Sequence, residues 1–168
     1  MRMIAAVAVA LLAVPAYAQQ SGKPGPEHEE LKKLVGTWDF VMDMGGSKAK
    51  GTTTYKSALS GMWVFSSMET ELFGQKFSGH GMESYDALKK KYVSVWADSM
   101  SGSPVVMEGT YDKAKKTMTM TGTGPGMDGA ATKYKSVTVM PDADTIDFTM
   151  YMGDGKEPGF TVKYKRKK

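Results

Sequence analysis

The chain has 168 residues, a formal net charge of +4 and no cysteine. This length favours one domain whose core is large enough to fold alone, and the absence of cysteine excludes any support from disulfides. The charge is weak and comes mostly from scattered lysines, so it gives poor support for nucleic acid as a partner.

The first eighteen residues predict a secretory signal peptide. Arg2 supplies a positive end, residues 3–14 form an apolar run, and Ala16-Tyr17-Ala18 is a small-x-small cleavage site before Gln19. The apolar run is shorter than the ~20 residues of a transmembrane helix, although an uncleaved membrane anchor remains the alternative. We therefore expect an exported protein, periplasmic or secreted, with no stable membrane insertion. The sequence leaves the oligomeric state undetermined.

A polar leader at residues 19–25 precedes a short predicted helix. Leu31, Leu34 and Val35 form one apolar stripe at helical spacing. A helix so short is not stable alone, so we expect it to cover one open end of the domain formed by residues 26–168.

A strand of regular alternation follows this helix. One of its faces carries large apolar groups, namely Trp38, Phe40, Met42 and Met44. The other face carries Asp39, Val41 and Asp43. A period of two predicts a strand with one buried face.

The same pattern repeats to the end of the chain. Further strands are predicted at residues 50–57, 62–73, 76–85, 92–98, 105–111, 117–123, 132–140, 145–152 and 160–166. The connections are short and leave no room for crossover helices. The sequence therefore predicts an all-β fold: a single closed or nearly closed antiparallel up-and-down barrel of about ten strands, with a short N-terminal helix at one end.

One hairpin has a turn signal that suggests a register. Gly74-Gln75 fits a two-residue type II′ turn, which needs glycine at its first central position. That turn places Leu72 opposite Phe77, Met68 opposite Gly81, and Glu69 opposite His80.

Arg166 is the only arginine beyond the predicted signal peptide. It ends the row of alternate residues Phe160, Val162 and Tyr164 on the last strand. A guanidinium stacked on Trp38 would join the last strand to the first, so we predict structural roles for both residues. The alternative is that Arg166 belongs only to the basic tail at residues 163–168.

Several short segments resemble known families. Leu34-Val35-Gly36-Thr37-Trp38 with a late arginine resembles the calycin superfamily, which includes lipocalins and fatty-acid-binding proteins. The chain more closely resembles the bacterial "domain of unknown function 1579" family. The segments that carry this resemblance are Pro24–His28, Leu34–Trp38, Leu59–Gly61, Tyr85-Asp86, Lys91–Met100 and Glu108–Asp112. The resemblance implies a calycin-like barrel, and because the family has no agreed activity it implies no catalytic residues.

The two histidines offer little for catalysis. His28 lies among glutamates on the helix and is interpreted as a solvated surface residue. Glu69 and His80, if paired, could be a base with its orienting carboxylate, two metal ligands or an exposed salt bridge. They are the weak catalytic candidates, and without further histidine or cysteine ligands we expect no metal site and no cofactor.

Methionine is unusually frequent, with 15 in the chain. Three strands carry two thioethers on one face, at Met42 and Met44, Met118 and Met120, and Met150 and Met152. Such side chains can fill a core, line a cavity for apolar ligands, or bind Cu(I). All three interpretations remain open.

The leading functional hypothesis is a binding protein that holds a small lipophilic molecule inside the barrel. A ten-stranded barrel is wider than one that side chains fill easily. The predicted ligand-binding residues are Phe40, Met42, Tyr55, Trp96, Met118, Phe148 and Met150. The alternatives are a packed barrel that acts by protein interaction, a copper binder, and an enzyme that uses Glu69 and His80.

Overall fold

A computed structural model describes residues 23–126 and 128–168. The predicted signal peptide and most of the predicted leader therefore lie outside the described residues. The elements are α1 (Pro26–Lys32), β1 (Gly36–Asp43), β2 (Lys48–Ala58), a 3-10 turn (Leu59–Gly61), β3 (Trp63–Leu72), β4 (Gln75–Asp86), β5 (Lys91–Asp98), β6 (Val105–Asp112), β7 (Thr117–Pro125), β8 (Ala131–Asp142), β9 (Thr145–Met152) and β10 (Phe160–Arg166). No helix in the described part of the chain has the length and apolar character needed to cross a membrane.

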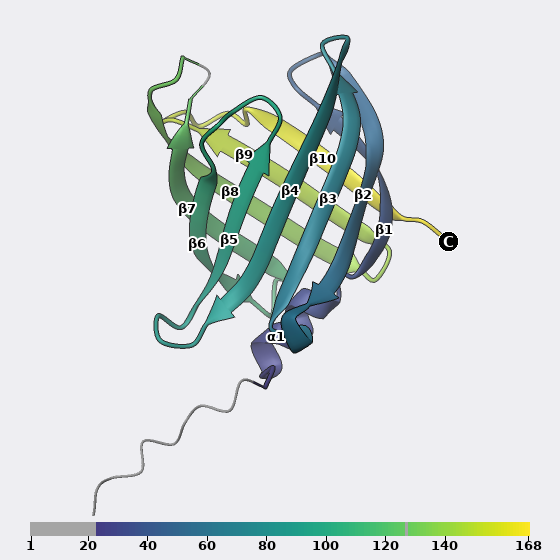
Figure 1. The fold of residues 1–168 in the computed structure, drawn as a ribbon, viewed down its shortest axis with the longest axis vertical. Helices are drawn as coiled ribbons and strands as arrows, with labels where there is room; N and C mark the ends of the chain where they lie inside the picture. The colour runs from purple at the N-terminus through teal and green to yellow at the C-terminus, as the bar shows by residue number, and fades with distance from the viewer. Residues whose placement is uncertain (1–22, 127) are drawn as a thin grey trace, which may run out of the picture.

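The ten strands form one closed antiparallel barrel. Each strand pairs with its neighbours in the chain, and β1 also pairs with β10, from Trp38 opposite Arg166 to Asp43 opposite Thr161. Figure 1 shows the tilted strands wrapping around one interior, with α1 at one end of the barrel. The predicted fold class is confirmed, because closure leaves no edge strand unpaired.

The β3–β4 hairpin differs from its predicted register. Its turn is Phe73-Gly74, and both residues have positive φ, 53° and 76°, as a type I′ turn requires. Leu72 therefore pairs with Gln75, and the opposite charges of Glu71 and Lys76 face each other across the strands. The register predicted from a Gly74-Gln75 turn was wrong by two positions, which leaves every side chain on its predicted face.

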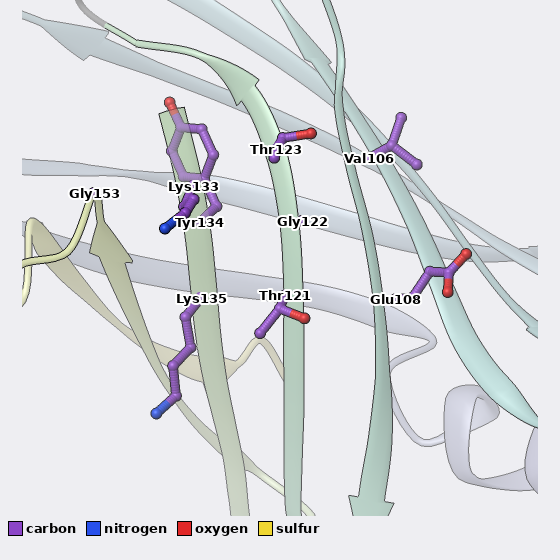
Figure 2. Close-up of a pocket in the computed structure, with 9 residues that line it drawn as sticks. All are labelled: Val106, Glu108, Thr121, Gly122, Thr123, Lys133, Tyr134, Lys135 and Gly153. Carbon is purple, nitrogen blue, oxygen red and sulfur yellow. The ribbon is translucent and has the colours of Figure 1, made fainter. Parts of the chain in front are cut away.

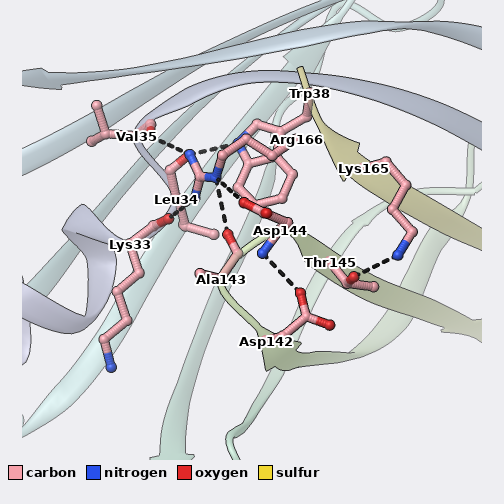
Figure 3. Close-up of polar contacts among 10 residues, drawn as sticks. All are labelled: Lys33, Leu34, Val35, Trp38, Asp142, Ala143, Asp144, Thr145, Lys165 and Arg166. Atoms are coloured by element: carbon pink, nitrogen blue, oxygen red, sulfur yellow. Dashed lines mark hydrogen bonds and ion pairs between the residues drawn. The ribbon is translucent and has the colours of Figure 1, made fainter. Parts of the chain in front are cut away.

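The first and last strands are joined by Arg166, as Figure 3 shows. The guanidinium carbon lies 4.0 Å from the centre of the Trp38 ring, and Nε lies 3.4 Å from the Asp144 carboxylate. The predicted stacking of Arg166 on Trp38 is therefore present.

Arg166 also holds three backbone carbonyls at the same end of the barrel. Its Nε, Nη1 and Nη2 atoms donate to the carbonyl oxygens of Ala143 (2.9 Å), Val35 (2.8 Å) and Lys33 (2.8 Å). The Trp38 indole N–H donates to the carbonyl of Leu34 at 2.7 Å. A lysine has no planar fork that could replace this set of contacts.

The helix α1 covers the same end and buries a residue that we predicted to be solvated. His28 is only 5% exposed, because α1 packs against β3 and β4. Leu31 of the same helix is buried as well. The His28 ring accepts a hydrogen bond at Nδ1 from the backbone N–H of Gly25 and meets Tyr85 edge-on at 6.3 Å. His28 is therefore part of the helix packing, and the interpretation as a surface residue was wrong.

Candidate functional site: the barrel interior

The seven predicted ligand-binding residues all lie in inward rows of the barrel. Phe40 and Met42 are buried on β1, opposite Tyr164 and Val162 of β10. The remaining five lie on four further strands, at Tyr55, Trp96, Met118, Phe148 and Met150.

These residues divide between two apolar clusters inside the barrel. Phe40 and Met42 belong to a cluster of buried residues against which Trp96 and Phe148 pack. Two other predicted residues, Met118 and Met150, pack against a second cluster. The buried residues of this cluster are Leu31, Val64, Tyr92, Met107 and Met120. Tyr55 contacts both clusters, so it lies between the two halves of the interior.

Inward side chains are buried to different degrees along the strands. The inward residues of β1 are buried, as are Tyr92, Met120 and Ile146 on β5, β7 and β9. In contrast, four inward side chains of these last three strands keep intermediate exposure, namely Trp96, Met118, Phe148 and Met150. Inward side chains of a solidly packed core lose nearly all contact with solvent. The interior beside β5, β7 and β9 therefore retains space that a water-sized molecule can reach.

Trp96 is positioned by two glycines of β4. An added Cβ would lie 2.2 Å from the indole at Gly79 and 3.4 Å from it at Gly81. The ring therefore lies across backbone that carries no side chain, and its N–H donates to the Asp98 carboxylate at 2.9 Å. These contacts fix the position of the Trp96 ring at the inner wall formed by β4 and β5.

An acidic residue lies toward the end of the inward row of β4. Glu83 lies between Val64 of β3 and Ser94 of β5. Its Oε2 is buried and has no hydrogen-bond partner among the described residues. Burial raises the pKa of Glu83 from 4.5 to about 8, because the charged form has lost its water.

Polar groups from β2, β3 and β10 lie near this carboxyl. Burial raises the pKa of Tyr55 and of Tyr164 well above the ordinary value, and the Glu83 charge adds to both shifts. A Cβ on Gly81 would lie 2.3 Å from Ser66 Oγ and 2.8 Å from Glu83 Oε1. The missing side chain at Gly81 thus leaves room for these two groups.

Cationic side chains lie elsewhere. The lysines of the described strands are all exposed, at positions Lys48, Lys50, Lys56, Lys76, Lys91, Lys133, Lys135, Lys163 and Lys165. Arg166 ends an inward row, but its guanidinium is committed to backbone carbonyls and Trp38. The described interior therefore has an unpaired acid on β4 and no free cation beside it.

Sequence reasoning missed Glu83 and Tyr164 as site residues. The signal for Glu83 was present, because Phe77, Gly79, Gly81 and Glu83 alternate along one strand. A register that points Phe77 inward also points Glu83 inward. The predicted site included only apolar and aromatic residues, so it omitted Glu83, the one acid in that row.

The weak catalytic candidates do not form a pair. Glu69 stands opposite Ser78 and His80 opposite Ser67, and both are exposed on the outer face. Within residues 23–126 and 128–168, no group of three or more His, Cys, Asp or Glu side chains could hold a metal ion. The geometry therefore gives Glu69 and His80 neither the pairing nor the inward position that the enzyme hypothesis required.

Two hollows open on the outside of the barrel. Figure 2 shows the first, of about 580 Å³, over β6, β7 and β8. It is lined by Val106, Glu108, Thr121, Gly122, Thr123, Lys133, Tyr134, Lys135 and Gly153. Glu108, its one acid, is paired with Lys89 and Lys91. The second hollow lies where α1 meets β3, β4 and β5, beside His28 and Tyr85.

Comparison with known proteins identifies a family. The model of a family described as "Protein of unknown function (DUF1579)" matches residues 23–166. No curated protein matches the chain.

Among solved structures, the chain is similar to designed β-barrels. A redesigned β-barrel, b11L5F_LGL, is 16% identical with a TM-score of 0.47, over 82% of this chain and 94% of that one. A de novo designed fluorescence-activating β-barrel is 12% identical with a TM-score of 0.48, over 81% and 95% of the two chains. The redesigned barrel mFAP1, bound to DFHBI, is 13% identical with a TM-score of 0.46, over 80% and 96%.

Proposed function

The chain belongs to the DUF1579 family, whose description assigns no function, and we propose from its geometry that it binds a small lipophilic molecule inside its calycin-like barrel. The observation that carries this proposal is the partial exposure of inward side chains on β5, β7 and β9. Apolar and aromatic groups line that space, so a ligand that displaces water from it gains ~25 cal/mol for each Å² of apolar area buried.

A dye titration tests this proposal. Nile red is expected to brighten and shift to the blue on binding, because it leaves water for an apolar interior. Replacing inward Met150 by tryptophan fills the space and should weaken binding at least tenfold, about 1.4 kcal/mol. The matched control is Thr149→Trp on the outer face of the same strand, which should bind as the wild type does.

Thermal melts of both variants establish that they are folded. The proposal fails if the wild type leaves the dye spectrum unchanged, or if the two variants weaken binding equally. Equal weakening would show that the substitutions act on the whole barrel and not through the interior space beside Met150.

The outer hollow over β6, β7 and β8 favours a second candidate, an interaction protein. Val106 there is 49% exposed, and Lys133 and Lys135 flank it. A dye that binds only at this outer face in the titration above would support this second candidate.

We also propose that the protein works outside the cytoplasm. The support is the pattern of residues 1–18, with Arg2, an apolar run and Ala16-Tyr17-Ala18. Mass spectrometry of the protein expressed from its full sequence in a bacterial host should find a chain that begins at Gln19 in the periplasmic or culture fraction. A chain that keeps residues 1–18 and stays with the membrane would instead support an uncleaved anchor.

A further inference from the structure

We propose that the barrel interior selects a lipophilic amine, whose protonated nitrogen pairs with the Glu83 carboxylate beside Tyr55 and Tyr164. This inference rests on the proposed function, since it names the chemical class of the ligand held in the same interior.

The Glu83 carboxyl lacks a hydrogen-bond partner in the described part of the chain. Its Oε2 is buried without a hydrogen-bond partner among the described residues, although Glu83 as a whole keeps intermediate exposure. Its strand neighbours are Val64 of β3, which offers no polar group, and Ser94 of β5, whose hydroxyl makes no hydrogen bond to Oε2. A buried carboxyl without a partner is unfavourable unless a charged or donating group reaches it. An ammonium group carries both a charge and N–H donors, so it satisfies this carboxyl directly.

The charges of the interior disfavour an anionic ligand. A fatty acid or another lipophilic carboxylate needs a cation in the interior, yet the lysines of the described strands are exposed on the outside. Arg166 stacks on Trp38 and donates to backbone carbonyls at the closed end. A ligand carboxylate would therefore find no free cation among the described residues, and any ionisation of Glu83 beside it would place two like charges in a site of low dielectric.

Polar, apolar and aromatic groups surround the carboxyl. Ser66 Oγ and Glu83 Oε1 occupy the place that a side chain at Gly81 would take, so both polar atoms lie at the inner wall of β4. The apolar clusters beside this wall include partly exposed inward side chains that can contact a hydrocarbon body. Aromatic rings border the site at Tyr55 and Tyr164, which both sense the Glu83 charge. Such rings also attract a cation that lies against their faces.

Proton balance makes the inference measurable. With a pKa of about 8, Glu83 in the empty barrel is mostly a neutral acid at pH 7. The titratable groups that face it are Tyr55 on β2 and Tyr164 on β10, and both stay neutral at that pH. An already protonated amine that pairs with the carboxylate must displace the Glu83 proton, so most of one proton per site is released into solution.

The experiment compares decylamine, decan-1-ol and decanoate by isothermal titration calorimetry at pH 7, below their aggregation thresholds. Titrations in phosphate and in Tris, which differ in ionisation enthalpy, measure the protons released. Decylamine is expected to bind at least tenfold more tightly than decan-1-ol, with release of most of one proton.

Glu83→Gln should abolish the proton release and remove the preference for the amine over the alcohol. Glu69→Gln, on the outer face of β3, is the matched control and should keep both. The proton release of the wild-type protein tests the inference even where the Glu83 variant does not fold.

The outcomes separate the two proposals. Decan-1-ol or decanoate binding as tightly as decylamine, or decylamine binding without proton release, overturns the amine inference and leaves interior binding intact. Nile red binding with no binding of decylamine has the same meaning. Failure of the dye and of all three decyl compounds overturns the proposed function as well.

Discussion

Replacing Trp38 with alanine is expected to lower the free energy of unfolding by about 3–5 kcal/mol, the usual range for removing a buried aromatic side chain. Trp38 is 0% exposed and donates to the Leu34 carbonyl. Its loss also removes the surface on which Arg166 stacks at the junction of β1 and β10. The seam that closes the barrel therefore loses packing and a cation–π contact together.

Urea denaturation followed by far-ultraviolet circular dichroism measures this loss. Trp63→Ala is the matched control, because Trp63 begins β3 and is only half-buried. It should cost clearly less than the Trp38 variant. Equal losses for the two variants would mean that the seam contributes no more to stability than an ordinary strand contact.

The fold could be predicted because its strands follow one rule. Trp38, Phe40 and Met42 share a face with period two, and the structure buries all three. Short connections between such strands permit only antiparallel neighbours. A single Arg166 at the end of the last inward row then marked where the sheet closes.

The errors came from choices that neighbouring structure decides. A positive φ at Phe73 is unfavourable for that residue alone, but the type I′ turn matches the twist of the flanking strands. His28 is surrounded by glutamates in sequence, yet contact of α1 with the barrel buries it. Local sequence carries neither the twist nor the docking of the helix.

The site could be predicted only in part for a related reason. Alternation places Phe40, Trp96 and Met150 inside, but it does not reveal how far opposite walls stand apart. Gly79 and Gly81 decide that distance locally, because their missing side chains admit Trp96, Ser66 and Glu83. Whether an interior is filled depends on ten strands at once, so no single segment predicts it.

The stability of the protein is expected to fall as the pH rises from about 5 to 9, because Glu83 must ionise without a partner. Its pKa is about 8 in the folded protein and 4.5 as an ordinary glutamate, so between these values the folded state holds more protons than the unfolded state. The contribution of neutral Glu83 is fully present below pH 4.5 and is lost as the pH passes 8. The total change is about 5 kcal/mol, since one pKa unit corresponds to about 1.36 kcal/mol.

Denaturation curves of the wild type and of Glu83→Gln, recorded at half-unit steps of pH, measure this change. The glutamine variant should show no such decline, and the difference between the two curves cancels the contributions of groups that they share. Glu69→Gln should keep the wild-type slope because Glu69 is exposed. Parallel wild-type and Glu83→Gln curves would show that water or a protein group already solvates this carboxylate, and the amine would then have no unmet charge to satisfy.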